Sequence, residues 1–361
     1  MEDSIHIPNT PSAAYGWAFP DNILYAIYRP DVDAGNPDSD QYDELRTFLL
    51  QEYGVPSAEH IDFTTALICD ALEAGVPVQE LQRAAKDAGV YELVTPLANE
   101  VMGRARNRAQ YWLGQVPAFV PEARRALVAA DYMAHDAYAN SPPRKSGGPY
   151  YTHPQQVAAI SLEAFSQVQQ SYFVEQEYVD AILALCLLHD GAEEVKRSRH
   201  YHSGTGAPTF NALQARYVFQ ETGNPHADMI SENLLFLTHY AKVPGAPSYW
   251  TYILQGMHKA GWRTTKISDL WHNLRINPKP ADNIAAQERV KRKNALYGSA
   301  LTMIQTYDAA APPDGAPKQS APMPKPIWEP AYHAAVCAVT VAQMPQLVNN
   351  LIIYMYGTAA A

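Results

Sequence analysis

The stretch YVDAILALCLLHDGAEE, residues 178–194, decides how the rest of the sequence is interpreted. Residues 178–188 are almost entirely apolar, a pattern that indicates a buried helix. Four ionisable side chains follow at once: His189, Asp190, Glu193 and Glu194. Ending a buried helix with such groups costs several kcal/mol unless something neutralises them, and a divalent metal is the usual partner. The stretch therefore predicts a helical core with a metal at the end of one helix.

Composition limits the classes of protein that remain. Apolar residues make up 47% of the 361 residues and charged residues 18%, which is typical of a globular protein. The net charge of −10 argues against broad nucleic-acid binding. The three cysteines have no CxxC partner, so we expect neither a disulfide framework nor a cysteine zinc site. The N-terminus lacks the basic and apolar regions of a secretory signal, and we expect a cytoplasmic protein.

The periodicity of apolar residues predicts an all-α protein, because strand signals are scarce throughout. Helices are expected at 40–53, 58–74, 77–88, 91–113, 121–139, 154–170, 176–192, 210–222, 226–239, 248–260 and 284–307. The run 331–357 has no charged residue apart from His333. A membrane helix needs about 20 mostly apolar residues, but Pro345 and several amides interrupt this run. We therefore expect a buried terminal helix and no membrane span.

Three regions follow from this pattern. Residues 1–118 form an N-terminal arm and helical region whose role the sequence does not reveal. Residues 119–310 carry the candidate metal chemistry. Residues 311–361 comprise a proline-rich linker and the terminal helix.

Two further residues are candidate ligands for a metal beside His189 and Asp190. His153 lies at a turn before a helix that Pro154 opens, and Asp269 lies in TTKISDLWHNLRI with Asn273 at i+4 on the same face. Taken singly, each is as well explained as a surface histidine or a solvated carboxylate. A neutral imidazole and a carboxylate together suit a first-row divalent metal such as Mn²⁺, Fe²⁺ or Zn²⁺.

The order His, His-Asp, Asp resembles that of the HD superfamily of metal-dependent phosphohydrolases. The resemblance is closer to the hydrolase domain of RelA/SpoT-type alarmone enzymes and to the stand-alone small alarmone hydrolases. RKSGGPYYTHP (144–154), LLHDGAEE (187–194) and KISDLWHNLR (266–275) are similar to three motifs of that family, in the same order. The similarity spans about residues 121–308. It implies an HD-domain helical bundle with an added N-terminal helical region and a C-terminal helix.

The resemblance implies roles for these residues. His153, His189, Asp190 and Asp269 would ligate one metal, Mn²⁺ by preference or another first-row divalent ion. Glu193 would orient or deprotonate the attacking water as general base, and Glu194 could share that role. Asn273 completes the implied catalytic set.

For the substrate, the family places an arginine on the nucleotide base and a lysine near phosphate, at the positions of Arg144 and Lys145. The alternative is two solvated loop cations. Other residues implied to contact substrate are Asn273 at a ribose or phosphate oxygen, Leu274 at the base, and Lys293 with Tyr297 at the phosphate-bearing ribose.

The sequence also departs from the family. Glu193-Glu194 replaces a Glu-Asp pair, Gly148 stands where glutamate is usual, and Leu270 replaces a basic residue. The basic insert 195–209 is either a lid that clamps phosphates or a solvated loop. The expected reaction is Mn²⁺-dependent hydrolysis of the 3′-pyrophosphate of ppGpp or pppGpp.

Two alternatives stay open. One is an HD phosphohydrolase that acts on another nucleotide, such as ppApp, NADPH or a nucleoside monophosphate. The other is a nucleotide sensor without turnover. The expected partner is a small-molecule purine nucleotide with a 3′-pyrophosphate, and assembly into a homo-oligomer is left open.

Overall fold

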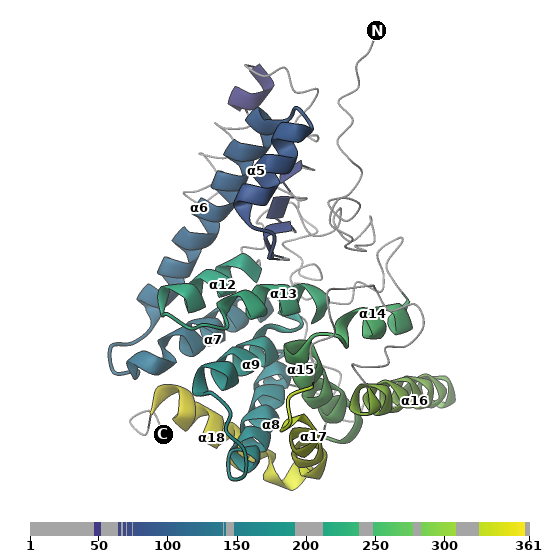
Figure 1. Ribbon diagram of the computed structural model, residues 1–361. Coiled ribbons are helices and arrows are strands. Elements are labelled where there is room, and N and C mark those ends of the chain that lie inside the picture. Colours follow the sequence, from purple (N-terminus) through teal and green to yellow (C-terminus); the bar gives the residue numbers. More distant parts are fainter. Residues whose placement is uncertain are drawn as a thin grey trace.

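The protein is described from a computed structural model, which covers residues 47–51, 64–65, 68–69, 71–73, 75–139, 141, 148–191, 212–237, 248–276, 283–307 and 325–357. Every regular element in these ranges is helical and none is a strand (Figure 1). The predicted all-α class is therefore confirmed.

Most helices begin and end within a few residues of the ranges expected from apolar periodicity. In chain order they are α5 (Val78–Asp87), α6 (Tyr91–Gln115), η1 (Glu122–Arg124), α7 (Arg125–Tyr138), α8 (Thr152–Val168), α9 (Gln176–Leu188), α12 (Ala212–Glu221), α13 (Ala227–Leu237), α14 (Tyr249–Gly256), α15 (Ala260–Trp271), η2 (His272–Ile276), α16 (Ile284–Thr306), α17 (Glu329–Ala338), η3 (Val341–Gln343) and α18 (Met344–Tyr356). Helix α15 was not among the expected ranges, and most of the helices expected at 40–53 and 58–74 lie outside the described residues.

Helices α8 and α9 form the centre of the fold. Every residue from Val179 to Leu188 is at most 4% exposed, so α9 is buried all round rather than along one stripe. Helices α7, α13 and α15 pack against α9, while α15, α17 and α18 pack against α8. In Figure 1, the paired α5 and α6 extend away from this centre, and α12 lies against α6. The ends of α8 and α9 are thus held by several neighbours at once.

The apolar run near the C-terminus forms two helices, where the sequence predicted one. Helix α17 ends at Ala338, and Thr340 begins a new turn because its side chain and that of Gln343 form a capping box. Pro345 then lies in the first turn of α18, where its missing N–H costs nothing. No single described helix is long and apolar enough to cross a membrane. The two taken together would be, but the chain bends by 86° between them.

A second difference lies at 248–260, which the sequence predicted to be one helix. Helix α14 ends at Gly256 because Trp262 of α15 packs directly on its backbone. A Cβ at Gly256 would lie 2.1 Å from Trp262 Cε2. The indole is fully buried and donates to the carbonyl of Phe236 at 2.8 Å. This close approach sets the direction of α15, the helix that carries Asp269.

An ion pair without contact to solvent joins α15 to α17. Arg263 is 1% exposed and donates to both carboxylate oxygens of Glu329, at 2.8 and 2.7 Å. The same guanidinium donates to the carbonyl of Met257 at 2.8 Å. Glu329 itself is fully buried. The C-terminal helices are therefore tied to the helix that carries a candidate ligand.

His333 predicts that the protein loses stability in acid. Burial, with Lys325 and Arg263 nearby, lowers the pKa of His333 to about 3. Glu329 Oε1 lies 3.5 Å away but is already neutralised by Arg263. Below the ordinary histidine pKa of about 6.5, His333 binds a proton in the unfolded chain but stays neutral in the folded chain. Folding stability therefore falls with decreasing pH, by about 2 kcal/mol between pH 7 and pH 5 from this residue.

Urea unfolding at the two pH values tests this. The His333→Gln protein should lose about 2 kcal/mol less than the parent between pH 7 and pH 5. His226→Gln removes a partly exposed histidine beside Glu175 and serves as control. Equal losses in the parent and in His333→Gln would refute the prediction.

Candidate functional site

Three helices bring the four predicted metal ligands together. His153 lies in the first turn of α8, His189 caps the C-terminal end of α9 with Asp190 next to it, and Asp269 lies in the last turn of α15. His153, His189 and Asp269 are at most 4% exposed. Because α8, α9 and α15 pack against one another, residues far apart in sequence meet at their ends. We call these four side chains the metal cluster.

The spacing within the metal cluster matches that of ligands around one ion. Nε2 of His153 lies 3.2 Å from Oδ1 of Asp269 and 3.7 Å from Oδ2 of Asp190. Nε2 of His189 lies 3.5 Å from Oδ1 of Asp190 and 3.6 Å from Oδ1 of Asp269. Ligands that bind a first-row metal at about 2.1 Å are roughly 3.0 Å apart at neighbouring octahedral positions and roughly 3.4 Å apart in tetrahedral geometry. His153, His189 and Asp190 each offer one ligand atom within 4.8 Å of the other two.

The protonation of His189 suits a metal ligand. Its Nδ1 donates to the carbonyl of Cys186 at 2.8 Å, so that Nε2 is the ring nitrogen that a metal could bind. Nε2 is buried and has no hydrogen-bond partner among the residues that the structure describes. A buried, unpartnered nitrogen that faces two carboxylates is unfavourable in itself. A divalent cation between these atoms would satisfy all of them, so the donor set fits a metal such as Mn²⁺ or Zn²⁺.

The carboxylates of the metal cluster are held in their charged form. Burial would raise the pKa of Asp269, but Lys266 and the two histidines hold it well below its usual value. Burial likewise opposes ionisation of Asp190, yet His189 above all keeps its pKa below the ordinary range. For His189, burial lowers the pKa, and the two carboxylates outweigh it and raise the pKa overall. The cluster is thus strongly polarised even without an ion.

Three neighbours orient the carboxylates. Lys266 Nζ donates to Oδ2 of Asp269 at 2.7 Å, and Asn273 Nδ2 donates to Oδ1 of the same residue at 2.6 Å. Tyr150 donates its hydroxyl to Oδ2 of Asp190 at 3.2 Å. Lys266 is itself buried. Asn273 lies beside the cluster, and its predicted contact with substrate stays a prediction.

The other described substrate candidates lie on and near α16. Lys293 Nζ lies 5.1 Å from the ring centroid of Tyr297, and Tyr297 lies 6.1 Å from the ring of Tyr249. Tyr249 in turn contacts Tyr252, whose ring lies 5.4 Å from Lys266 Nζ. A row of aromatic rings therefore connects α16 to the lysine that holds Asp269.

The remaining predicted site residues lie partly within and partly outside the described residues. Leu274 packs partly buried against the core, and its contact with a base stays a prediction. Arg144, Lys145, Glu193, Glu194 and the insert 195–209 lie outside the described residues. Gly148 has φ of +78°, which agrees with a tight turn before His153.

Sequence reasoning missed His272 and Gln156. Nδ1 of His272 lies 2.9 Å from Nδ1 of His153, and its Nε2 lies 2.7 Å from Oε1 of Gln156. Both residues follow a predicted ligand by three positions, Gln156 after His153 and His272 after Asp269. That spacing puts each on the ligand's own helix face and is the signal that could have found them. His272 opens a single π-helical turn, a feature frequent at functional sites.

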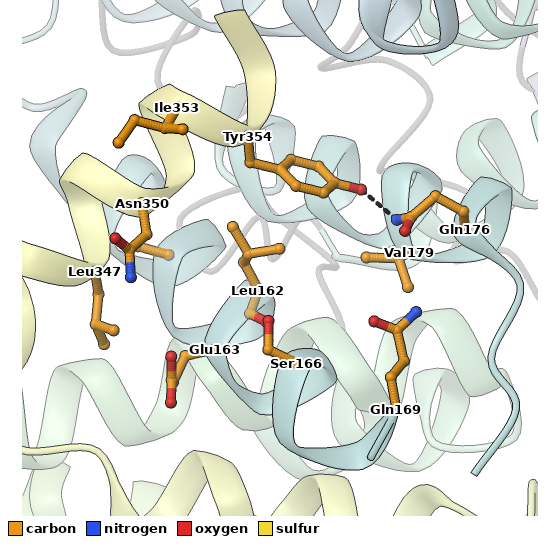
Figure 2. Close-up of a pocket in the computed structure, with 11 residues that line it drawn as sticks. Leu162, Glu163, Ser166, Gln169, Gln176, Val179, Leu347, Asn350, Ile353 and Tyr354 are labelled. Atoms are coloured by element: carbon orange, nitrogen blue, oxygen red, sulfur yellow. Dashed lines mark hydrogen bonds between the residues drawn. The ribbon is translucent and has the colours of Figure 1, made fainter. Parts of the chain in front are cut away.

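A separate hollow lies between α8, α9 and α18, away from the metal cluster (Figure 2). It has a volume of about 320 Å³ and none of the predicted site residues lines it. Its polar side chains already have partners within the protein. Figure 2 shows Gln176 directed at the hydroxyl of Tyr354, Ser166 donates to the carbonyl of Leu162, and Gln169 donates to that of Val174. These contacts are typical of packing between helices and indicate no catalytic or binding role for the hollow.

Comparison of the chain with protein families, with curated proteins and with solved structures gives no match.

Proposed function

We propose that this protein is a divalent-metal-dependent phosphohydrolase that removes the 3′-pyrophosphate of a purine alarmone, with ppGpp and pppGpp as the leading substrates. The observation that carries the proposal is the convergence of two histidines and two aspartates, with four nitrogen–oxygen distances of 3.2–3.7 Å between them. On a six-coordinate ion such as Mn²⁺, two imidazole and two carboxylate ligands would leave two positions open for water and substrate, as a catalytic site requires.

The charges around the metal cluster favour a phosphate substrate. Asp190 and Asp269 are partly balanced by Lys266, so a divalent ion would leave the cluster with excess positive charge. Held by these four residues, Mn²⁺ would acidify a water molecule and neutralise phosphate charge. Lys293 on α16 adds a further cation, and Tyr297 adds an aromatic face that suits a ribose or base.

Side chains around the metal cluster would then have separate roles in hydrolysis. Asn273 and Lys266 keep Asp269 in one orientation, and Tyr150 does so for Asp190. Glu193 is the proposed acceptor of the proton from water. Water would replace the ribose 3′ oxygen on the proximal phosphorus, so that the 3′ hydroxyl and pyrophosphate are the products.

The test is hydrolysis of a nucleotide panel with Mn²⁺ and with chelator, with the products resolved by chromatography. The panel contains ppGpp, pppGpp, ppApp, NADPH and deoxynucleoside monophosphates. We expect pyrophosphate from one of the first three in the presence of Mn²⁺ and none with chelator. Mn²⁺ binding without turnover of any nucleotide would refute the proposal in favour of a sensor. Release of phosphate from NADPH or a monophosphate would refute the assigned substrate class.

A further inference from the structure

His153, His272 and Gln156 form a hydrogen-bonded row behind the metal cluster, which we call the imidazole relay. Nδ1 of His153 lies 2.9 Å from Nδ1 of His272, and Nε2 of His272 lies 2.7 Å from Oε1 of Gln156. Both rings are buried, with centroids 4.6 Å apart. We infer that the relay is a positioning device, in which the Gln156 amide fixes the proton of His153 on Nδ1 and so presents Nε2 to a divalent metal.

The inference follows from counting protons along the row. A neutral imidazole has one N–H donor and one acceptor nitrogen, and an amide oxygen only accepts. The proton between Gln156 and His272 therefore belongs to Nε2 of His272. This makes Nδ1 of His272 an acceptor, so the proton between the two rings belongs to Nδ1 of His153. Nε2 of His153 is then the ring nitrogen that faces the metal cluster, 3.2 Å from Oδ1 of Asp269, and it is the atom that a bound metal would take.

The orientation of a single amide thus decides whether His153 can bind a metal. Were the Gln156 amide reversed, its NH₂ group would donate and every proton in the row would shift. The proton on His153 would then lie on Nε2 and occupy the place of the ion. His189 has no such dependence, because a backbone carbonyl, that of Cys186, holds its proton on Nδ1. Gln156 is therefore a positioning residue that acts through His272.

Helix geometry explains why Gln156 has this role and the neighbouring Gln155 does not. His153 and Gln156 are three residues apart on α8 and share a face, whereas Gln155 points about 100° away. The relay rests on the metal cluster of the proposed function and is independent of the substrate assigned to it.

The test compares Gln156→Met with the matched control Gln155→Met. Methionine preserves the length of the side chain, but its thioether sulfur is only a weak acceptor for the N–H of His272. Loss of an outer hydrogen-bond partner typically weakens metal binding about 10- to 100-fold. We expect the Kd for Mn²⁺, measured by calorimetry, to rise by about that factor in Gln156→Met and to stay unchanged in Gln155→Met. Circular dichroism checks that both variants are folded.

A second measurement needs no variant and decides the matter if Gln156→Met fails to fold. Nitrogen NMR of the histidine-labelled, metal-free parent should find protons on Nδ1 of His153 and on Nε2 of His272. A His153 ring without a proton on Nδ1, or parental Mn²⁺ affinity in folded Gln156→Met, would overturn the inference. A parent that binds Mn²⁺ but hydrolyses no nucleotide refutes the proposed function and leaves the relay standing. A parent that binds no divalent ion overturns both.

Discussion

Replacing Asp190 with alanine is expected to abolish both the stabilisation of the protein by Mn²⁺ and its hydrolytic activity. At a Mn²⁺ concentration about 100 times Kd, the parent should gain about 2.7 kcal/mol of unfolding free energy from the bound ion. Asp190 supplies oxygen atoms at 3.5 and 3.7 Å from the two histidine nitrogens. Without it the cluster loses a ligand and half of its negative charge, and the gain should disappear.

The expected loss of activity is large. An ion that lowers the barrier by about 4 kcal/mol accounts for roughly a 1,000-fold acceleration, so Asp190→Ala should lose at least that much. Chemical unfolding with and without Mn²⁺ and a pyrophosphate-release assay measure the two effects. Asp87→Ala, at the exposed end of α5, is the control and should behave as the parent does. Undiminished stabilisation by Mn²⁺ in Asp190→Ala would contradict the assignment of this ligand.

Replacing Glu329 with alanine is expected to produce the largest loss of stability. Arg263 is 1% exposed and Glu329 fully buried, so the variant leaves a guanidinium without its counter-charge inside the protein. Breaking a buried pair in this way costs about 3–5 kcal/mol. Removing both partners is much less harmful, because no uncompensated charge remains. The double variant Arg263→Met, Glu329→Leu should therefore recover a good part of the loss.

Urea unfolding of the single and double variants measures these differences. Glu100→Ala is the matched control, because Glu100 pairs with Arg104 at i+4 near the surface of α6. Such pairs contribute about 0.3–0.5 kcal/mol. A loss in Glu329→Ala no larger than that in Glu100→Ala would show that the buried pair does not hold α17 to α15.

The sequence predicted the helices well where local patterning determines them. Helix α9 could be predicted because its apolar run is almost uninterrupted. Helix α16 has a local start signal, because the side chain of Asn283 accepts a hydrogen bond from the N–H of Ala286. The break after Gly256 could not be predicted, because it depends on Trp262 packing against that backbone. The bend between α17 and α18 was locally encoded, in the capping pair Thr340 and Gln343, and was overlooked.

The metal cluster could be predicted as a set of residues but not as a geometry. His189 and Asp190 were indicated by charges that follow a buried helix, and Asp269 by a motif on a helix face. The contact between His153 and His272 joins residues 119 positions apart. It depends on how α8 meets the end of α15, and no local pattern encodes that crossing. For the same reason the burial of Lys266 against Asp269 became visible only in the fold.

The most direct test of the metal centre is to add Mn²⁺ to the metal-free protein and to monitor its binding by electron paramagnetic resonance. We predict one tightly bound ion per chain, with spin-echo modulation from the nitrogens of two directly coordinated histidines, His153 and His189. Absence of a tightly bound ion, or an ion without histidine nitrogen coupling, would contradict the assignment of the cluster as a metal centre.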